Sequence, residues 1–305
     1  MTSYRILSLD GGGMRGIFTA AVIAQLEQDL GVRLADHVDL IVGTSTGGII
    51  GLGLAARKTG EQMRDFYADE GARIFARPRS LPRRLRQAKY DRRVLDEVLQ
   101  REFGDQRLND LSTPVCITAH ELVAGTTRVW KDDHHHGLSG GGDLLVWKVA
   151  AATAAAPTYF APVQLGAADS HVDGGIWANN PALVGITEAV RYAGRSLDDI
   201  RLLSIGTTTR TFQVQDHDHA RRMGLLAWLK EARELLLGGS VSMASDKQAE
   251  LLLPPGAYLR LNSERATHVP LDDYEKCAGL REVGEQVARL HRHQVRALLS
   301  TDTTD

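Results

Sequence analysis

The sequence predicts an α/β protein whose central sheet is mostly parallel and is covered by helices on both faces. Helical patterns alternate with short apolar runs, at residues 5–9, 38–42, 115–119, 127–130 and 201–205. Nearly continuous apolar strands are typical of sheets buried on both faces, and crossover helices join strands that run parallel. No internal repeat or long linker interrupts the 305 residues, so we expect one domain over residues 1–299 and a disordered polar tail over residues 300–305.

The helices can be placed from their periodicity and their end signals. Pro157 is expected to end an Ala-rich helix that begins near residue 144, because proline lacks an N–H donor and restricts the residue before it. Asn180 followed by Pro181 predicts a helix cap with proline at the first helical position. Three helices are expected near the N-terminus, over about residues 14–30, 47–57 and 60–71. An amphipathic helix docked on the core is predicted near the C-terminus by four apolar residues at helical spacing: Leu280, Val283, Val287 and Leu290.

The composition is that of a soluble chain that can form a core, with 43% hydrophobic and 24% charged residues. It excludes intrinsic disorder, and 30 Gly with 2 Cys exclude collagen-like chains and disulfide scaffolds. The net charge of −2 disfavours a nucleic-acid binder. Two isolated cysteines (Cys116 and Cys277), no recognisable signal peptide and no long apolar run predict a cytoplasmic protein without a transmembrane helix.

A glycine-rich turn follows the first strand. Residues 10–16 read DGGGMRG, in which Gly11, Gly13 and Gly16 satisfy the G-x-G-x-x-G pattern of dinucleotide-binding turns. That interpretation also requires an acid at the end of the second strand, which here ends at Gly43 without one. Successive glycine N–H groups ahead of a helix can instead bind an anion, including the oxyanion of acyl transfer. A turn with a purely structural role is the third interpretation.

The second strand leads into the sequence GTSTG at residues 43–47, a G-x-S-x-G pattern. Gly43 and Gly47 allow the sharp turn between strand and helix that exposes the Ser45 hydroxyl above the sheet. Because a strand precedes it, a helix follows it and an oxyanion-type turn belongs to the same sheet, we interpret Ser45 as a nucleophile. The alternative is a Ser/Thr-rich cap of a Gly-rich helix.

A serine nucleophile needs a general base, and the histidines lack a supporting motif. The candidates among them are His120, His134, His135, His136, His217, His219 and His268. The run of three histidines also lacks Cys or Glu at ligand spacing, which argues against a metal site. Asp173 is the better candidate, because Gly174 and Gly175 follow it and permit a close backbone approach at a reaction centre. An ordinary Asp-Gly turn is the alternative.

Taken together, these motifs resemble the patatin-like phospholipase family over about residues 4–210. The resemblance rests on DGGGMRG, GTSTG and DGG in this order, and also on AATAAAPTYF, NNP and LSIGT at residues 151–160, 179–181 and 203–207. It implies a three-layer α/β/α patatin-like fold. It also implies a serine lipid acyl hydrolase of the phospholipase A type, which cleaves fatty-acyl esters of membrane phospholipids.

The resemblance further implies a Ser–Asp dyad, with Ser45 as nucleophile, Asp173 as base and an acyl-enzyme between the two half-reactions. The oxyanion hole would be lined by the glycine turn and its arginine: Gly11, Gly12, Gly13 and Arg15. Its donors would be the Gly12 and Gly13 amides, and no metal or other cofactor would be required. The enzyme would be peripheral to the phospholipid membrane when active. Some bacterial members of similar length are anti-phage effectors switched on by cyclic nucleotides, which adds a cyclic nucleotide activator and antiviral defence as hypotheses.

Two other functional classes stay open. An NAD(P)-binding oxidoreductase built on residues 11–16 would leave Ser45 and Asp173 without a role. A catalytically silent binding or storage protein of the same fold would keep the motifs without the activity.

A strongly basic segment follows the third predicted helix. Residues 73–93 contain nine basic residues and one acid, Asp91, so the segment carries +8 while the rest of the chain carries −10. Apolar residues and prolines are interspersed and predict irregular structure: Phe75, Pro78, Leu81, Pro82 and Leu85. A solvated loop, attraction to anionic lipid headgroups and docking of a phosphate-bearing regulator are the three interpretations.

Overall fold

The computed structural model describes residues 3–135, 141–209, 216–224, 227–228, 239–264 and 269–300. Within them one sheet is formed by seven strands: β1 (Tyr4–Leu9), β2 (Leu40–Gly43), β3 (Val115–Glu121), β4 (Thr126–Lys131), β5 (His171–Asp173), β6 (Ile200–Ile205) and β7 (Tyr258–Leu261). The order is β4-β3-β2-β1-β6-β7, with β5 paired to β3 off this path. All neighbours are parallel except β4 and β5, which run antiparallel to β3, so the predicted mostly parallel sheet is confirmed.

Helices of very different lengths connect these strands. The longer ones are α1 (Gly16–Leu30), α2 (Thr46–Ala55), α3 (Gly60–Phe75), α5 (Arg92–Phe103), α6 (Val146–Thr153), α8 (Ala182–Arg191), α11 (Gly239–Leu252) and α13 (Leu280–Leu299). The short ones are α4 (Leu81–Arg84), α7 (Gly175–Ala178), α9 (His217–Arg221) and α12 (Tyr274–Ala278), and 3-10 turns cover Gly13–Arg15, Leu34–His37, Leu108–Asp110 and Leu197–Asp199.

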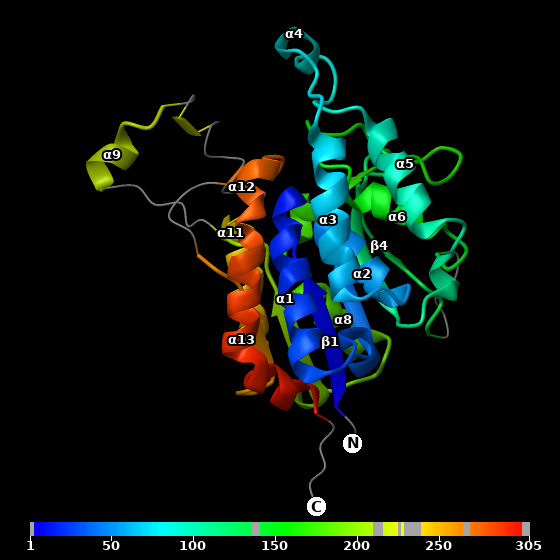
Figure 1. Cartoon of the computed structure of the whole chain (residues 1–305), viewed down its shortest axis with the longest axis vertical. Helices are drawn as coiled ribbons and strands as arrows, with labels where there is room; N and C mark the ends of the chain where they lie inside the picture. The colour runs from blue at the N-terminus through cyan, green and yellow to red at the C-terminus, as the bar shows by residue number, and fades with distance from the viewer. Residues whose placement is uncertain are drawn as a thin grey trace, which may run out of the picture.

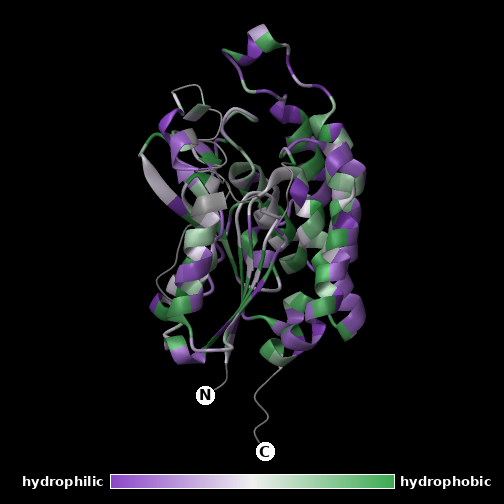
Figure 2. Cartoon of the chain, turned by 90° about the vertical axis from the view of Figure 1, so that its left-hand side faces the viewer, coloured by the Kyte–Doolittle hydropathy of each residue, from purple (hydrophilic) through white to green (hydrophobic). Residues whose placement is uncertain are grey.

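The sheet is the middle of three layers. Alternate residues of β1 point to opposite faces, so Leu7 and Leu9 pack in one core with α1, α3 and α13, whereas Ile6 packs in a second core with α8 and α11. Figure 1 shows α1, α3 and α13 side by side over the sheet, and Figure 2 shows hydrophobic strands between helices that carry hydrophilic residues. The predicted α/β/α architecture is confirmed.

Several element boundaries differ from the sequence prediction. The Ala-rich helix α6 ends at Thr153, four residues before Pro157: residues 154–160 form turns, and the Ala155 carbonyl accepts from the Asp173 N–H over 3.1 Å. The Asn180 side chain accepts from the Ala182 N–H over 3.0 Å, but the predicted cap is one residue too early: Pro181 is the cap residue of α8 and precedes the first helical residue. Leu290 was predicted on the buried stripe of the last helix, yet 69% of it is exposed and Val295 and Leu298 provide the contact instead.

Both cysteines are fully buried, Cys116 on β3 and Cys277 on α12. In the described part of the chain, no helix has the length and apolar character needed to span a membrane. Of the predicted polar tail, only Ser300 is among the described residues, and residues 301–305 lie outside them.

Candidate active site

Ser45 lies on a strained turn between β2 and α2. Its φ of 53° and ψ of −122° place a non-glycine residue in a region that costs about 1–3 kcal/mol and that persists only when the surroundings enforce it. Gly47 makes the turn possible, because a Cβ atom at that position would lie 2.2 Å from the Leu9 carbonyl oxygen. The predicted sharp turn is present at Ser45.

Hydrogen bonds from neighbouring elements hold this turn. The Ser45 N–H donates to Thr153 Oγ1 at the end of α6 over 2.8 Å. The Thr44 hydroxyl donates to the Ala178 carbonyl over 2.6 Å and lies 2.7 Å from Thr118 Oγ1. The strained conformation is therefore enforced by α6, α7 and β3 together.

Strand register brings Asp173 to Ser45. β2 pairs with β3 as far as Ile117, which lies opposite Gly43. Two residues further along β3, Ala119 lies opposite Asp173, the last residue of β5. Because β5 runs antiparallel to β3, the carboxyl ends of β2 and β5 converge. The nucleophile candidate and the acid therefore come from two strand ends that meet head to head.

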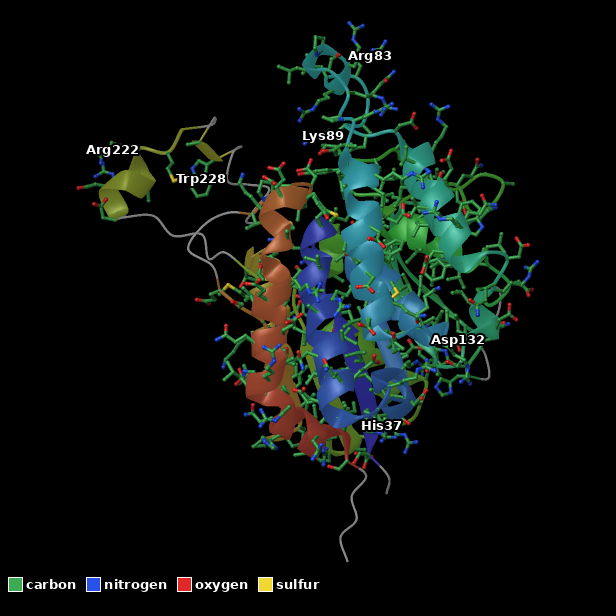
Figure 3. The ribbon with its side chains drawn as sticks, viewed as in Figure 1. His37, Arg83, Lys89, Asp132, Arg222 and Trp228 are labelled. Atoms are coloured by element: carbon green, nitrogen blue, oxygen red, sulfur yellow. The ribbon has the colours of Figure 1, made fainter. Side chains whose placement is uncertain are left out.

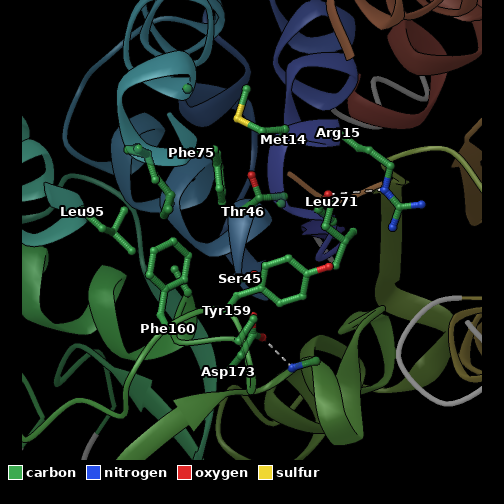
Figure 4. A pocket seen from close by; sticks show the side chains of 18 of the residues that line it. Met14, Arg15, Ser45, Thr46, Phe75, Leu95, Tyr159, Phe160, Asp173 and Leu271 are labelled. Atoms are coloured by element: carbon green, nitrogen blue, oxygen red, sulfur yellow. Dashed lines mark hydrogen bonds between the residues drawn. The ribbon is translucent and has the colours of Figure 1, made fainter. Parts of the chain in front are cut away.

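Asp173 is buried, with 5% of its surface exposed. Burial raises the pKa of its carboxyl to about 6, while hydrogen bonds from the Ser45 side chain and the Gly175 N–H act in the opposite direction. The Gly175 N–H donates to Asp173 Oδ1 over 2.7 Å, and Gly174 occupies the tight junction between β5 and α7. Figure 4 shows Ser45 and Asp173 facing the same pocket.

The glycine turn packs against this pair. The Gly11 N–H donates to the Asn179 carbonyl over 2.9 Å, and the Met14 N–H donates to the Leu271 carbonyl over 2.7 Å. Gly13 has a φ of +57°, which suits glycine. In the described residues the N–H groups of Gly12 and Gly13 make no hydrogen bond with the protein. Two adjacent amides are therefore available to a ligand beside Ser45.

Arg15 and Gly11 support the turn instead of presenting donors to the pocket. The Arg15 guanidinium donates to the Gly12 carbonyl over 3.3 Å and to the Thr208 carbonyl over 3.5 Å, and in Figure 4 it points away from Ser45. The Gly11 carbonyl accepts from Thr207 Oγ1 over 2.8 Å. Both residues belong to the predicted set, but their polar groups hold the loop.

Asp10, which opens the turn, pairs with a residue that no sequence motif indicated. Arg260 on β7 donates through Nη1 to Asp10 Oδ1 over 2.9 Å and through Nη2 to Asp10 Oδ2, and Nη1 also donates to Ser204 Oγ over 2.6 Å. The Asp10 side chain is 2% exposed and that of Arg260 13%. A charged residue within the apolar strand β7 was the only local signal of this contact.

The pocket beside Ser45 is largely apolar and has about 900 Å³ of empty space, its open mouth included. Ser45, Asp173, Gly12 and Gly13 lie in its wall. The remaining wall is provided mainly by apolar side chains, among them Ile49, Phe66, Phe75, Leu95, Tyr159 and Phe160. Such a lining accommodates a hydrocarbon chain next to the two polar side chains.

The histidines lie elsewhere in the described part of the chain, where none lines this pocket. His134 lies between Asp132 and Glu188, with Nδ1–Oδ1 and Nε2–Oε1 distances of 3.1 and 3.3 Å, and these carboxylates raise its pKa to about 9 despite burial. His136 and His268 fall outside the described residues. No described group of three or more His, Cys, Asp or Glu side chains could hold a metal ion.

A family model described as patatin-like phospholipase matches residues 7–186. The chain belongs to the patatin-like phospholipase family. A Pseudomonas aeruginosa protein named cGAMP-activated phospholipase is 40% identical over 212 residues, which cover 68% of this chain and 63% of that protein. A Vibrio cholerae protein of the same name is 31% identical over 319 residues, covering 93% and 90%. The chain thus spans less than two thirds of the first relative and most of the second.

Among solved structures, VipD from Legionella pneumophila matches with a TM-score of 0.44 and 12% identity, covering 92% of this chain and 67% of that chain. The family assignment confirms the resemblance inferred from the motifs and supports the predicted enzyme class, carboxylic ester hydrolysis. For this patatin-like chain the matched residues include Ser45 and Asp173 but not Arg260.

Proposed function

We propose that the protein hydrolyses fatty-acyl esters of membrane phospholipids through a Ser45–Asp173 dyad. One observation carries the proposal: a strained serine faces a buried carboxyl beside two unpaired glycine amides, in the wall of an apolar pocket. Nucleophile, base, oxyanion donors and an acyl-chain pocket thus share one site. The hydrogen-bonded Gly11 amide and the absence of an acid at the end of β2 argue against a dinucleotide at the same turn.

The reaction would proceed in two half-reactions. Ser45 Oγ attacks the ester carbonyl carbon while Asp173 accepts the hydroxyl proton, and the Gly12 and Gly13 amides stabilise the oxyanion. Each such donor contributes about 3–4 kcal/mol in mutational terms. The tetrahedral intermediate expels the lysophospholipid alkoxide, which takes the proton from Asp173. Water then gives a proton to Asp173 and attacks the acyl-enzyme, and the fatty acid leaves as Ser45 regains its proton.

The test is phospholipid hydrolysis by Ser45→Ala and Asp173→Asn proteins, with Ser112→Ala as a matched control outside the pocket. We expect both dyad variants to lose activity by at least about a thousandfold and the control to keep it. Mass spectrometry of the products from mixed phospholipid vesicles would identify the ester cleaved. Labelling of Ser45 by a fluorophosphonate probe would separate an active enzyme from a silent protein of this fold. Full activity in either dyad variant excludes the mechanism.

We also propose that a cyclic dinucleotide switches on this activity, in the context of antiviral defence. The support is the name that the relatives from Pseudomonas aeruginosa and Vibrio cholerae share, cGAMP-activated phospholipase. The experiment compares vesicle hydrolysis with and without 3′,3′-cGAMP. A large increase in rate is expected, and a constitutive rate that the nucleotide leaves unchanged would count against activation.

A further inference from the structure

An arm formed by residues 76–89 leaves the body of the protein beyond α3 and carries α4 near its far end. Figure 1 shows α4 standing apart from the other helices, at the opposite end of the molecule from the two termini, and Figure 3 shows Arg83 on α4 and Lys89 where the arm returns. We call residues 80–87 the tip. Every residue of the tip is exposed, whereas Arg79, Ala88 and Lys89 at the base of the arm are partly buried.

The base of the arm is attached to the wall of the pocket. The N–H groups of Lys89 and Tyr90 donate to the carbonyls of Thr158 and Tyr159 over 2.8 and 2.9 Å. The Tyr90 hydroxyl donates to Asp272 over 2.6 Å, and the Tyr90 ring stacks on that of Tyr159, 6.5 Å between centroids. Because Tyr159 lines the pocket, the arm rises from the rim of the candidate active site.

The basic residues of this region fall into two groups. Those near its base have acidic partners: Arg73, Arg79, Lys89, Arg92 and Arg93. In the part of the chain that the structure describes, the other four arginines of the arm make no ion pair: Arg77, Arg83, Arg84 and Arg86. The positive charge that is free to act on a partner is therefore concentrated on the arm.

Two leucines accompany these arginines. Leu81 is 71% exposed and Leu85 is 84% exposed. They are four residues apart across a helical turn, which places them on the same side of it. Single exposed leucines are common on protein surfaces. Two exposed leucines on one side of a turn, flanked by arginines without an ion pair, form a small apolar projection surrounded by positive charge.

We propose that the tip inserts Leu81 and Leu85 into an anionic lipid surface while the arginines bind the headgroups, so that the pocket rim faces the bilayer. Each basic side chain near an anionic membrane strengthens binding by about fivefold. A soluble phosphate-bearing ligand is held in a concave site and would give the two leucines no role. The tip is instead a projection with exposed apolar side chains. The proposal rests on the proposed function only in that the substrate lies in a bilayer.

The first experiment measures co-sedimentation of the full chain with vesicles of phosphatidylcholine alone or mixed with equal parts of phosphatidylglycerol, with and without 3′,3′-cGAMP. We expect binding to the anionic vesicles, and a loss of about tenfold or more for Leu81→Asp/Leu85→Asp. The matched control is Leu251→Asp/Leu290→Asp, which changes the charge equally at leucines that are 73% and 69% exposed on other helices. Arg83→Gln/Arg86→Gln should weaken binding, and Arg292→Gln/Arg296→Gln should leave it unchanged.

A second experiment tests insertion directly. Because Cys116 and Cys277 are fully buried, a Leu85→Cys protein carries one exposed thiol in the described residues for an environment-sensitive fluorophore. We expect the fluorescence to rise with anionic vesicles, and to stay constant for the same label in a Leu290→Cys protein.

Hydrolysis of a water-soluble short-chain ester separates this proposal from the proposed function, because it needs the pocket but no bilayer. The tip variants should keep that activity and lose hydrolysis of vesicles. Absence of vesicle binding in the unmodified chain, or equal binding by tip and control variants, overturns the proposal. So does loss of cyclic dinucleotide binding in the tip variants with vesicle binding intact, since the arm would then be a nucleotide site.

Discussion

At the scale of single residues, the environment of Asp173 determines when it can act as a base. Its pKa is raised to about 6 by burial, with hydrogen bonds from Ser45 and Gly175 in opposition. A carboxylate in water would be too weak a base for a serine, whereas this shift brings its basicity close to that of a histidine. Burial thus gives the Asp173 carboxylate a basicity that a Ser–His pair obtains from the imidazole.

This shift predicts the pH dependence of activity. The proposed base must be ionised in the free enzyme, so kcat/KM for a water-soluble ester should rise about tenfold per pH unit below about pH 6 and level off above it. The measurement is a pH–rate profile with a substrate that does not titrate. A profile that stays flat between about pH 5 and pH 7 would show that another group limits the reaction.

The same residue predicts a gain in stability when its charge is removed. The folded pKa of about 6 lies above the ordinary value of 3.8, so Asp173 favours the folded state below about pH 4 and loses that contribution as pH rises through 6. Asp173→Asn should therefore raise the free energy of unfolding at about pH 8 by about 2–3 kcal/mol relative to the unmodified protein. Urea unfolding at about pH 4 and pH 8 measures the difference. Equal stabilities at the higher pH would contradict the buried-charge account.

At the scale of elements, the site is a consequence of strand ends and close backbone contacts. β5 continues along β3 where β2 stops, which brings Asp173 to Ser45. α2 approaches β1 so closely that Gly47 lies against the Leu9 carbonyl. The turn that strains Ser45 therefore depends on the packing of a helix onto a neighbouring strand.

Two glycines of α2 test this dependence. A Cβ at Gly47 would meet the Leu9 backbone at 2.2 Å, whereas a Cβ at Gly53 would meet the Met63 sulfur at the same distance. A methionine side chain can move and a strand backbone cannot, so Gly47→Ala should cost more than about 3 kcal/mol of stability and abolish activity. Gly53→Ala should have a small effect, since alanine favours the helix. Thermal unfolding and ester hydrolysis of the pair would check this, and equal losses would contradict it.

The features of the site that depend on neighbouring residues in the sequence could be predicted, and those that depend on contacts across the fold could not. Ser45 and Asp173 stand next to glycines whose spacing indicates sharp turns, so their motifs are readable in a few residues. The roles of Thr153 and Asn179 depend on contacts across the fold and could not be read from the motifs around them. Leu290 was wrongly placed because helical periodicity indicates an apolar stripe but not how far the neighbouring surface extends.

At the scale of the whole molecule, the C-terminal third completes the site although it carries no recognisable motif. Ser242 on α11 accepts from Asn179 over 2.8 Å, the Leu271 carbonyl accepts from the Met14 N–H, and Arg260 pairs with Asp10. Arg260 and Asp10 are 250 residues apart in sequence, so this pairing is a tertiary property. The glycine turn is thus held from the end of the chain.

The Asp10–Arg260 pair yields a prediction that spans the molecule. Arg260→Met would leave the Asp10 carboxylate buried without its cation, which should cost about 3–5 kcal/mol and lower ester hydrolysis because Asp10 begins the glycine turn. Asp10→Asn/Arg260→Met removes both charges and should recover much of the stability, since no isolated charge stays buried.

Arg281→Met is the control, because its ion pair with Glu285 is at the surface and contributes less than about 1 kcal/mol. Urea unfolding of the unmodified protein, Asp10→Asn, Arg260→Met and the double variant gives the coupling energy. Additive effects of the Asp10 and Arg260 substitutions would mean that the pair does not hold the turn, and the C-terminal third would then support the site through packing alone.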